Sequence, residues 1–114
     1  MKLTIALALG VLAAGCDQAY AQSILTDNNG MTLYTFDKDS AGVSTCYDSC
    51  ATAWPPFLAA ADAASPGNGL TVIARNDGTH QWAKDGAPLY YWQGDSAPGQ
   101  TTGDGVGGVW HIAR

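Results

Sequence analysis

The stretch LYTFDKDSA at residues 33–41 recurs in altered form as LYYWQGDSA at residues 89–97, a shift of 56 positions along the chain. Each copy holds a tyrosine, a second aromatic residue and an aspartate at the same spacing: Tyr34, Phe36 and Asp39, then Tyr90, Trp92 and Asp95. The same shift relates Trp54 to Trp110. A repeat of this size predicts one supersecondary unit used twice, because each copy is too small to bury its apolar face alone.

The first copy predicts a β-hairpin. Residues 23–26 and 31–37 flank an Asp-Asn-Asn-Gly turn, in which Gly30 tolerates positive φ. Side chains alternate between the two faces of a strand, so Tyr34 and Phe36 lie in line on one surface.

Three further segments predict a β-meander. Residues 70–75, 79–83 and 87–93 are joined by the turns Asn-Asp-Gly and Lys-Asp-Gly. Residues 59–69 are rich in Ala, Ser, Pro and Gly and predict an exposed connection between the halves. We therefore predict an all-β fold with at most a short helix, in which two related hairpin or meander units pack with pseudo-two-fold symmetry.

The motif residues have predicted structural roles. The aromatic residues supply a shared core, since a large aromatic side chain buries roughly 150 to 250 Å², or about 4 to 6 kcal/mol as an upper bound. Asp39 and Asp95 follow the predicted strands, where a carboxylate accepts backbone N–H bonds and closes a turn.

Residues 1–21 predict a signal peptide. Met1 and Lys2 precede an uncharged apolar stretch at residues 3–14, which is followed by small and polar residues. This stretch is shorter than the roughly 20 residues that cross a bilayer. We therefore expect export rather than a membrane span.

Two cleavage sites are open. Ala-Tyr-Ala before Gln22 fits ordinary signal peptidase, which would cleave between residues 21 and 22. Ala-Ala-Gly before Cys16 resembles a lipobox, which would place cleavage between residues 15 and 16 and acylate Cys16. We favour the lipobox, and Asp17 after the lipidated cysteine then predicts retention at the inner membrane. The predicted location is the periplasm or cell envelope, with the membrane as a partner through the anchor.

The remaining residues 22–114 predict a single small domain made of two repeats, at about 23–58 and 70–114. All ten acidic residues are aspartates, and the formal net charge is −5. The basic residues that remain after cleavage are Lys38, Arg75, Lys84 and Arg114. We therefore expect no nucleic-acid partner.

Catalytic patterns are missing from the sequence. Ser40 and Ser96 stand in Asp-Ser-Ala rather than Gly-x-Ser-x-Gly. Neither His80 nor His111 has the spacing of a catalytic triad. We expect no enzymatic activity and no cofactor.

The repeated Tyr-x-aromatic-x-x-Asp motif resembles the signature of the secreted-repeat family of predicted bacterial lipoproteins. The segment from Cys46 to Cys50, which leads to Trp54-Pro55-Pro56, is also similar to the first repeat of that family. The resemblance covers nearly all of the mature chain. It implies an exported, often lipid-anchored protein built from tandem repeats, and it supplies no catalytic residue.

Cys46 and Cys50 allow two interpretations. In an oxidising periplasm a disulfide is the first expectation. Residues four apart on a regular helix have Cβ atoms about 5 to 6 Å apart, whereas a disulfide needs roughly 3.5 to 4.5 Å. The segment is therefore either a distorted turn, or the thiols stay apart.

The alternative is a copper site. Thiolates together with imidazole suit copper, and Cys46 and Cys50 could be joined by His80, His111 or Met31 as a further ligand. This interpretation predicts a periplasmic copper or redox protein.

The favoured function is a binding or structural module of the cell envelope. Tyr91 and Trp82 fall outside the motif alignment, so the repeated scaffold does not account for them. Exposed amphipathic rings give contact area at low entropic cost, and Tyr91 above all is the predicted place for a ligand or protein partner.

Overall fold

The computed structural model describes residues 23–114. The predicted signal peptide, both cleavage sites and the lipidation at Cys16 lie outside the described residues and stay predictions. Within the described part, no helix combines the length and the apolar character needed to cross a membrane.

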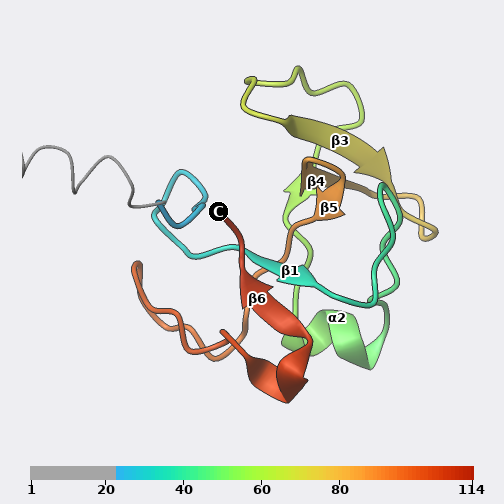
Figure 1. Ribbon diagram of the computed structural model, residues 1–114. Coiled ribbons are helices and arrows are strands. Elements are labelled where there is room, and N and C mark those ends of the chain that lie inside the picture. The colour runs from blue at the N-terminus through green and yellow to red at the C-terminus, as the bar shows by residue number, and fades with distance from the viewer. Residues whose placement is uncertain (1–22) are drawn as a thin grey trace, which may run out of the picture.

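Short strands make up most of the regular secondary structure of the described chain (Figure 1). The elements in chain order are β1 (Tyr34–Phe36), α2 (Ser49–Ala53), β2 (Leu58–Ala59), β3 (Leu70–Ala74), β4 (His80–Lys84), β5 (Ala87–Pro88), the 3-10 helix η1 (Val106–Gly108) and β6 (Trp110–Ile112). The prediction of an all-β fold with at most a short helix is confirmed, since α2 has only five residues and η1 only three.

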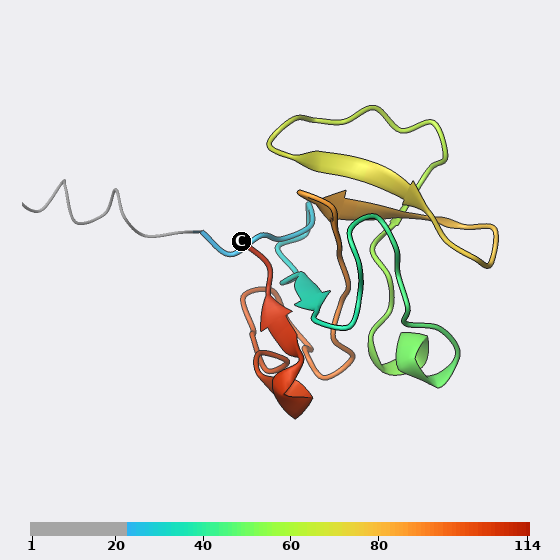
Figure 2. The ribbon, with the colours of Figure 1, turned by 45° about the vertical axis from the view of Figure 1, so that its right-hand side comes forward.

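The larger sheet contains the predicted meander of β3, β4 and β5, at the top of Figures 1 and 2. β4 pairs antiparallel with β3 along its whole length, and its other edge pairs with β5. Asp85 and Gly86 form the two-residue turn between β4 and β5, with φ values of 50° and 89°. Two successive positive φ angles match the twist of a tight hairpin, which favours Asp-Gly at this turn.

The strand β2 takes one residue from the predicted connection. Ala59 pairs with His80 and Leu58 pairs with Gln81, whereas residues 60–69 belong to no strand and are mostly exposed, as the sequence predicts. A strand of two residues is too short to show an alternating hydrophobic pattern in the sequence. Its extended conformation depends on pairing with the neighbouring β4 rather than on local sequence.

The predicted N-terminal hairpin is present but short. β1 pairs with β6, and residues 23–26 and 31–37 are joined by one bridge, Thr26 to Thr32, with N–H bonds from Leu33 to the carbonyl of Leu25 and from Asp27 to the carbonyl of Met31. Asp27 also holds the turn, because its Oδ1 accepts the N–H groups of Asn29 and Met31. These bonds give the backbone an alternative to a longer ladder.

A pseudo-two-fold axis passes between Tyr34 and Tyr90. The N–H of Tyr34 donates to the carbonyl of Tyr90 at 2.8 Å, and the N–H of Tyr90 donates to the carbonyl of Tyr34 at 2.9 Å. The pairing of Tyr34 with Ile112 in β1 and β6 has its counterpart in the bridge between Tyr90 and Pro56. In the adjacent pair Tyr91 donates to the carbonyl of Pro55, but proline has no N–H to return the bond, which limits the second pairing to a bridge. The predicted pseudo-two-fold symmetry is confirmed.

The alternation of side chains along the two central segments produces two cores. Tyr34 and Tyr90 point into an aromatic core. Leu33 and Leu89, one position earlier, are fully buried in a smaller aliphatic core with Ala113. The two faces of one strand segment thus serve different layers.

Candidate functional site

Four rings follow one another across the boundary between the repeats, with two stacked pairs and a last pair that is tilted by 32°. The centroids of Phe36 and Trp110 are 4.1 Å apart, those of Trp110 and Trp54 are 3.8 Å apart, and those of Trp54 and Trp92 are 4.2 Å apart. The rings come alternately from the first and the second repeat. Each repeat therefore supplies one face of every stacked pair.

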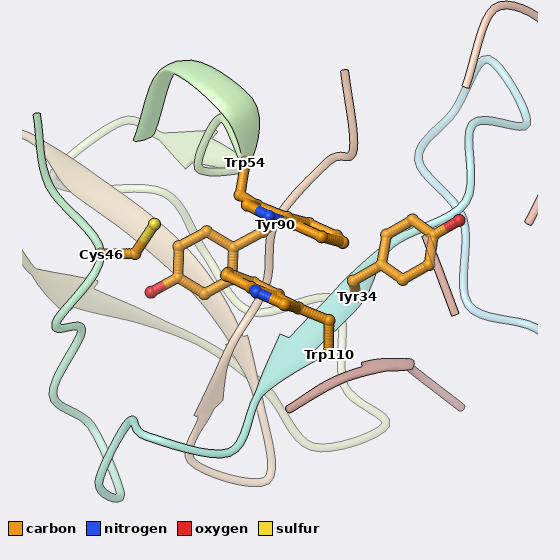
Figure 3. Close-up of a cluster of buried hydrophobic side chains, with 5 residues drawn as sticks. All are labelled: Tyr34, Cys46, Trp54, Tyr90 and Trp110. Carbon is orange, nitrogen blue, oxygen red and sulfur yellow. The ribbon is translucent and has the colours of Figure 1, made fainter. Parts of the chain in front are cut away.

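The two motif tyrosines close the sides of this stack. Tyr34 meets Trp54 edge-on at 5.4 Å, and Tyr90 meets Trp110 in the same way at 5.2 Å. Figure 3 shows the two indoles face to face with a tyrosine on each side. Edge-to-face contacts of this kind are favourable beyond the area that they bury.

The tyrosines and aspartates of the motif are exchanged between the repeats. The hydroxyl of Tyr34 donates to Oδ2 of Asp95 at 2.6 Å, and the hydroxyl of Tyr90 donates to Oδ2 of Asp39 at 2.7 Å. Each motif thus supplies a donor to one bond and an acceptor to the other. The motif tyrosine of one copy recognises the motif aspartate of the other copy.

The second oxygen of each aspartate holds a loop. Oδ1 of Asp39 accepts both the N–H and the hydroxyl of Thr45, and Oδ1 of Asp95 accepts both groups of Thr102. Thr102 lies one residue beyond the place that a constant shift of 56 assigns to the counterpart of Thr45. The register of the repeat therefore slips by one residue in this loop.

The shift between the repeats returns to 56 residues at Trp54 and Trp110. α2 precedes Trp54 with five residues, whereas η1 precedes Trp110 with three. The segment before Trp110 is irregular, with positive φ at Gly105, Gly107 and Gly108, so it reaches the tryptophan by a path that differs from that of α2. Asp104 is consequently not the structural counterpart of Asp48, as a constant shift would have made it.

A buried arginine extends one of the two tyrosine networks. The guanidinium of Arg75 donates to Ser44 and Gln81, and the Ser44 hydroxyl is bonded to the hydroxyl of Tyr90. The chain of bonds ends at Asp39, so a buried cation and a carboxylate are joined through two hydroxyls. Burial, with a further contribution from Asp39, raises the pKa of Tyr90 well above its usual range. No pattern in the sequence predicts this role of Arg75.

Cys46 and Cys50 form a disulfide, as expected from an oxidising compartment. Their Cα atoms are 5.2 Å apart. The segment is a distorted turn: α2 begins only at Ser49, and Asp48 before it has a φ of 56°. Cys46 thus lies outside the helix, which removes the spacing that a regular helix would impose.

The remaining residues of the copper hypothesis lie on separate elements. His80 belongs to β4, and His111 on β6 is bonded through Nε2 to Oδ2 of Asp37 at 2.8 Å. Residues 23–114 contain no group of three or more His, Cys, Asp or Glu side chains placed to hold a metal ion. Thiolate ligation would require reduction of the disulfide, so copper binding by the reduced protein stays a prediction.

An open groove lies on the side of the larger sheet that faces the N-terminal loop. It has a volume of about 300 Å³. The residues that line this aromatic groove are Thr26, Asp27, Asn28, Phe57, Ala64, Pro66, Leu70 and Trp82. Phe57 and Trp82 are its two rings, with centroids 6.3 Å apart and planes inclined by 39°.

Tyr91 contacts two of the residues that line the groove but does not line it itself. Its ring meets Phe57 edge-on at 5.7 Å, and its hydroxyl donates to Oδ2 of Asp27 at 2.8 Å. Tyr91 is half-buried rather than open to solvent, and burial raises the pKa of its phenol well above the usual range. Tyr91 thus fixes Asp27 and Phe57, whereas Trp82 lines the open space.

The ring of Phe57 has no equivalent in the other repeat. The N–H of Phe57 donates to the carbonyl of Leu89 at 2.9 Å, and the N–H of Ala113 donates to the carbonyl of Leu33 at 2.9 Å. Leu89 and Leu33 are related by the repeat. Ala113 is therefore the counterpart of Phe57.

Trp82 likewise replaces an aliphatic residue. Its N–H donates to the carbonyl of Phe57 at 2.9 Å, just as the N–H of Leu25 donates to the carbonyl of Ala113 at 2.9 Å. The groove aromatics Phe57, Trp82 and Tyr91 thus stand where the pseudo-symmetry places Ala113, Leu25 and Thr35. Sequence reasoning identified Trp82 and Tyr91 but missed Phe57 and Asp27; comparing Phe57 with Ala113 in the aligned repeats would have revealed the first.

The comparisons with known proteins agree with the internal repeat. Residues 23–57 and 71–114 match a family model described as a secreted repeat of unknown function. The two matches cover more than half of the chain, so the protein belongs to this secreted-repeat family. The resemblance found from the motif is confirmed, and the family description supports an exported protein. No curated protein and no solved structure matched the chain.

Proposed function

We propose that this domain is a non-catalytic binding module of the cell envelope whose ligand site is the aromatic groove. The observation that carries the proposal is the broken symmetry. The scaffold is built equally well with alanine, leucine and threonine at the equivalent places, so it does not require three aromatic residues here. Aromatic rings beside an open concave surface are typical of ligand sites.

The motif residues are proposed to be structural. Both oxygens of Asp39 and both oxygens of Asp95 accept bonds within the domain, and the tyrosine hydroxyls are donors in the same networks. A carboxylate occupied in this way is poorly placed to act as a general base. This supports a rigid scaffold that presents a separate binding surface.

The proposed location is the periplasmic side of the inner membrane, with a lipid on Cys16 as the tether. The apolar stretch and lipobox-like residues before Cys16 support this part of the proposal. Intact mass measurement of protein from the native membrane fraction tests it. Acyl chains on a chain that begins at Cys16 are expected, whereas an unmodified chain that begins at Gln22 would show a soluble protein.

Amide NMR shift mapping tests the binding role. The probes are choline, N-acetylglucosamine, galacturonate and trialanine, which represent a cation, a neutral sugar, an anion and a peptide. At least one probe is expected to shift the amides that surround the groove. Shifts confined to other surfaces, or none with any probe, would show that the groove is not a ligand site.

Variants that restore symmetry supply the control. Trp82→Leu introduces the residue that the other repeat has at this place, and it is expected to abolish the shifts while the fold is kept. Trp92→Phe removes a half-buried indole outside the groove and is expected to leave them unchanged. Equal loss in both variants would indicate a general effect on the fold.

A further inference from the structure

The charge of the aromatic groove is carried by one residue. Among the eight residues that line it, Asp27 is the single charged side chain. The rest of the lining consists of aromatic, aliphatic and neutral polar groups. An anionic ligand would therefore meet a carboxylate with no basic group in the lining to offset it.

Asp27 is held in its charged form by neutral donors. Its Oδ1 accepts the N–H groups of Asn29 and Met31 at 2.9 and 3.0 Å, and its Oδ2 accepts the hydroxyl of Tyr91. Desolvation alone would raise the pKa of Asp27, but the bonds from Tyr91, Met31 and Asn29 outweigh it and lower the pKa below its ordinary value. The carboxylate is thus ionised at neutral pH, and the donors that fix it leave its charge uncompensated.

The rings offer the second element of recognition. Trp82 and Phe57 both line the groove, and their rings are inclined to one another by 39°. An indole face is the strongest aromatic partner for a cation, and quaternary ammonium groups are recognised by cages of such rings with a nearby carboxylate. A volume of about 300 Å³ suits a small molecule rather than a chain segment.

We propose that the aromatic groove binds a small soluble organic cation, an alkylammonium or quaternary ammonium compound, which lies against Trp82 with its charge toward Asp27. This inference rests on the proposed binding function and names its ligand class. A neutral sugar would stack on the same indole without using the charge, and it is the alternative that the experiment must separate.

The test compares choline with dimethylbutanol, its uncharged isostere, which has carbon in place of the quaternary nitrogen. Both are titrated into the whole domain and followed by the amide shifts around the groove at low ionic strength. Choline is expected to bind about tenfold more tightly than the isostere, and added salt is expected to weaken it. Equal affinity for the two compounds would overturn the proposal.

Asp27→Asn tests the carboxylate while keeping the loop. Asparagine retains the oxygen that accepts the N–H groups of Asn29 and Met31, so the fold is expected to survive. The affinity for choline is expected to fall about tenfold and that for the isostere to stay the same. Asp48→Asn is the matched control, since Asp48 is exposed and its side chain caps no helix.

The outcomes separate the inference from the proposed function. Shifts of the groove amides by N-acetylglucosamine but not by choline would show a binding groove for neutral ligands and reject the cation. Sedimentation with phosphatidylcholine vesicles in the absence of choline binding would reject a soluble ligand in favour of a lipid surface. If no probe shifts the amides around the groove, both proposals are rejected.

Discussion

Tyr34 and Asp95 are separated by 61 positions in the sequence and joined by a hydrogen bond of 2.6 Å between the phenol and the carboxylate. The same bond occurs a second time between Tyr90 and Asp39. The pairs connect the two repeats in both directions. In this chain the repeated motif therefore forms the contact between the copies rather than a contact within one copy.

Removal of the Tyr34 hydroxyl is expected to destabilise the domain. Tyr34→Phe leaves a buried carboxylate oxygen of Asp95 without its donor, which costs about 1.5 to 3 kcal/mol. The measurement is chemical denaturation of the parent, both single variants and the double variant with Asp95→Asn. A coupling energy near zero between the two positions would show that the bond contributes nothing.

Loss of an indole from the stack is expected to cost more than loss of the groove indole. Trp54 contacts three other rings, so Trp54→Ala should lower the free energy of unfolding by about 3 to 5 kcal/mol. Trp82→Leu keeps an apolar side chain at a place where the other repeat has leucine, and it should cost less than about 1.5 kcal/mol. The reverse order would mean that Trp82, not the stack, holds the domain together.

The disulfide is expected to make a modest contribution. It closes a loop of only a few residues, for which chain entropy predicts about 2 kcal/mol. Cys50→Ser in the absence of reductant should show this loss in denaturation. Intact mass before and after reduction verifies the bond itself, since a gain of two hydrogens is expected.

The reduced protein is the form in which copper is tested. Cuprous ion titrated into the reduced parent and into the reduced Cys46→Ser variant should bind unequally if the cysteines are ligands. Equal binding would remove the copper hypothesis. Loss of binding in a His111→Gln variant would identify the imidazole partner.

Stability is expected to fall in alkaline solution. Burial raises the pKa of Tyr34, Tyr90 and Tyr91 in the folded state above the ordinary 10.0, and their bonds to aspartates raise it further. The stabilisation from keeping these phenols neutral is complete below pH 10.0 and is lost as the pH rises from there toward the folded pKa. Denaturation midpoints measured between neutral pH and pH 11 check this. Tyr91→Thr should reduce the slope, because it removes one of the three phenols.

Much of the fold could be predicted because it depends on local sequence patterns. Turn residues at fixed spacing predicted β3, β4 and β5, and the repeated motif predicted the two-fold relation of Tyr34 and Tyr90. The contact of Tyr34 with Asp95 rather than Asp39 could not be predicted. Both aspartates stand at positions compatible with the motif, and the choice depends on how the copies pack.

The groove itself was not predicted, and only two of its aromatic residues were. Trp82 and Tyr91 were recognisable because the scaffold did not require them. Asp27 has the sequence position of a turn residue, and its side chain does stabilise the turn. Its other carboxylate oxygen accepts a hydrogen bond from Tyr91, which is distant in the sequence. Contacts between elements distant in sequence carry no local periodicity, so the sequence alone could not assemble the site.

Because the stacked rings come alternately from the two repeats, neither repeat can complete the aromatic core alone. A polypeptide with one copy would expose the face of its indole and leave its motif carboxylate without a phenol, so it would be completed only by a second molecule. The present chain is arranged like a symmetrical homodimer whose two subunits are joined in one polypeptide. Because the halves are joined, they need not be identical, and the aromatic groove lies where their side chains differ. In longer tandem arrays of this repeat, the copies should accordingly pack two by two. An array with an odd number of copies would leave one copy to pair with another molecule.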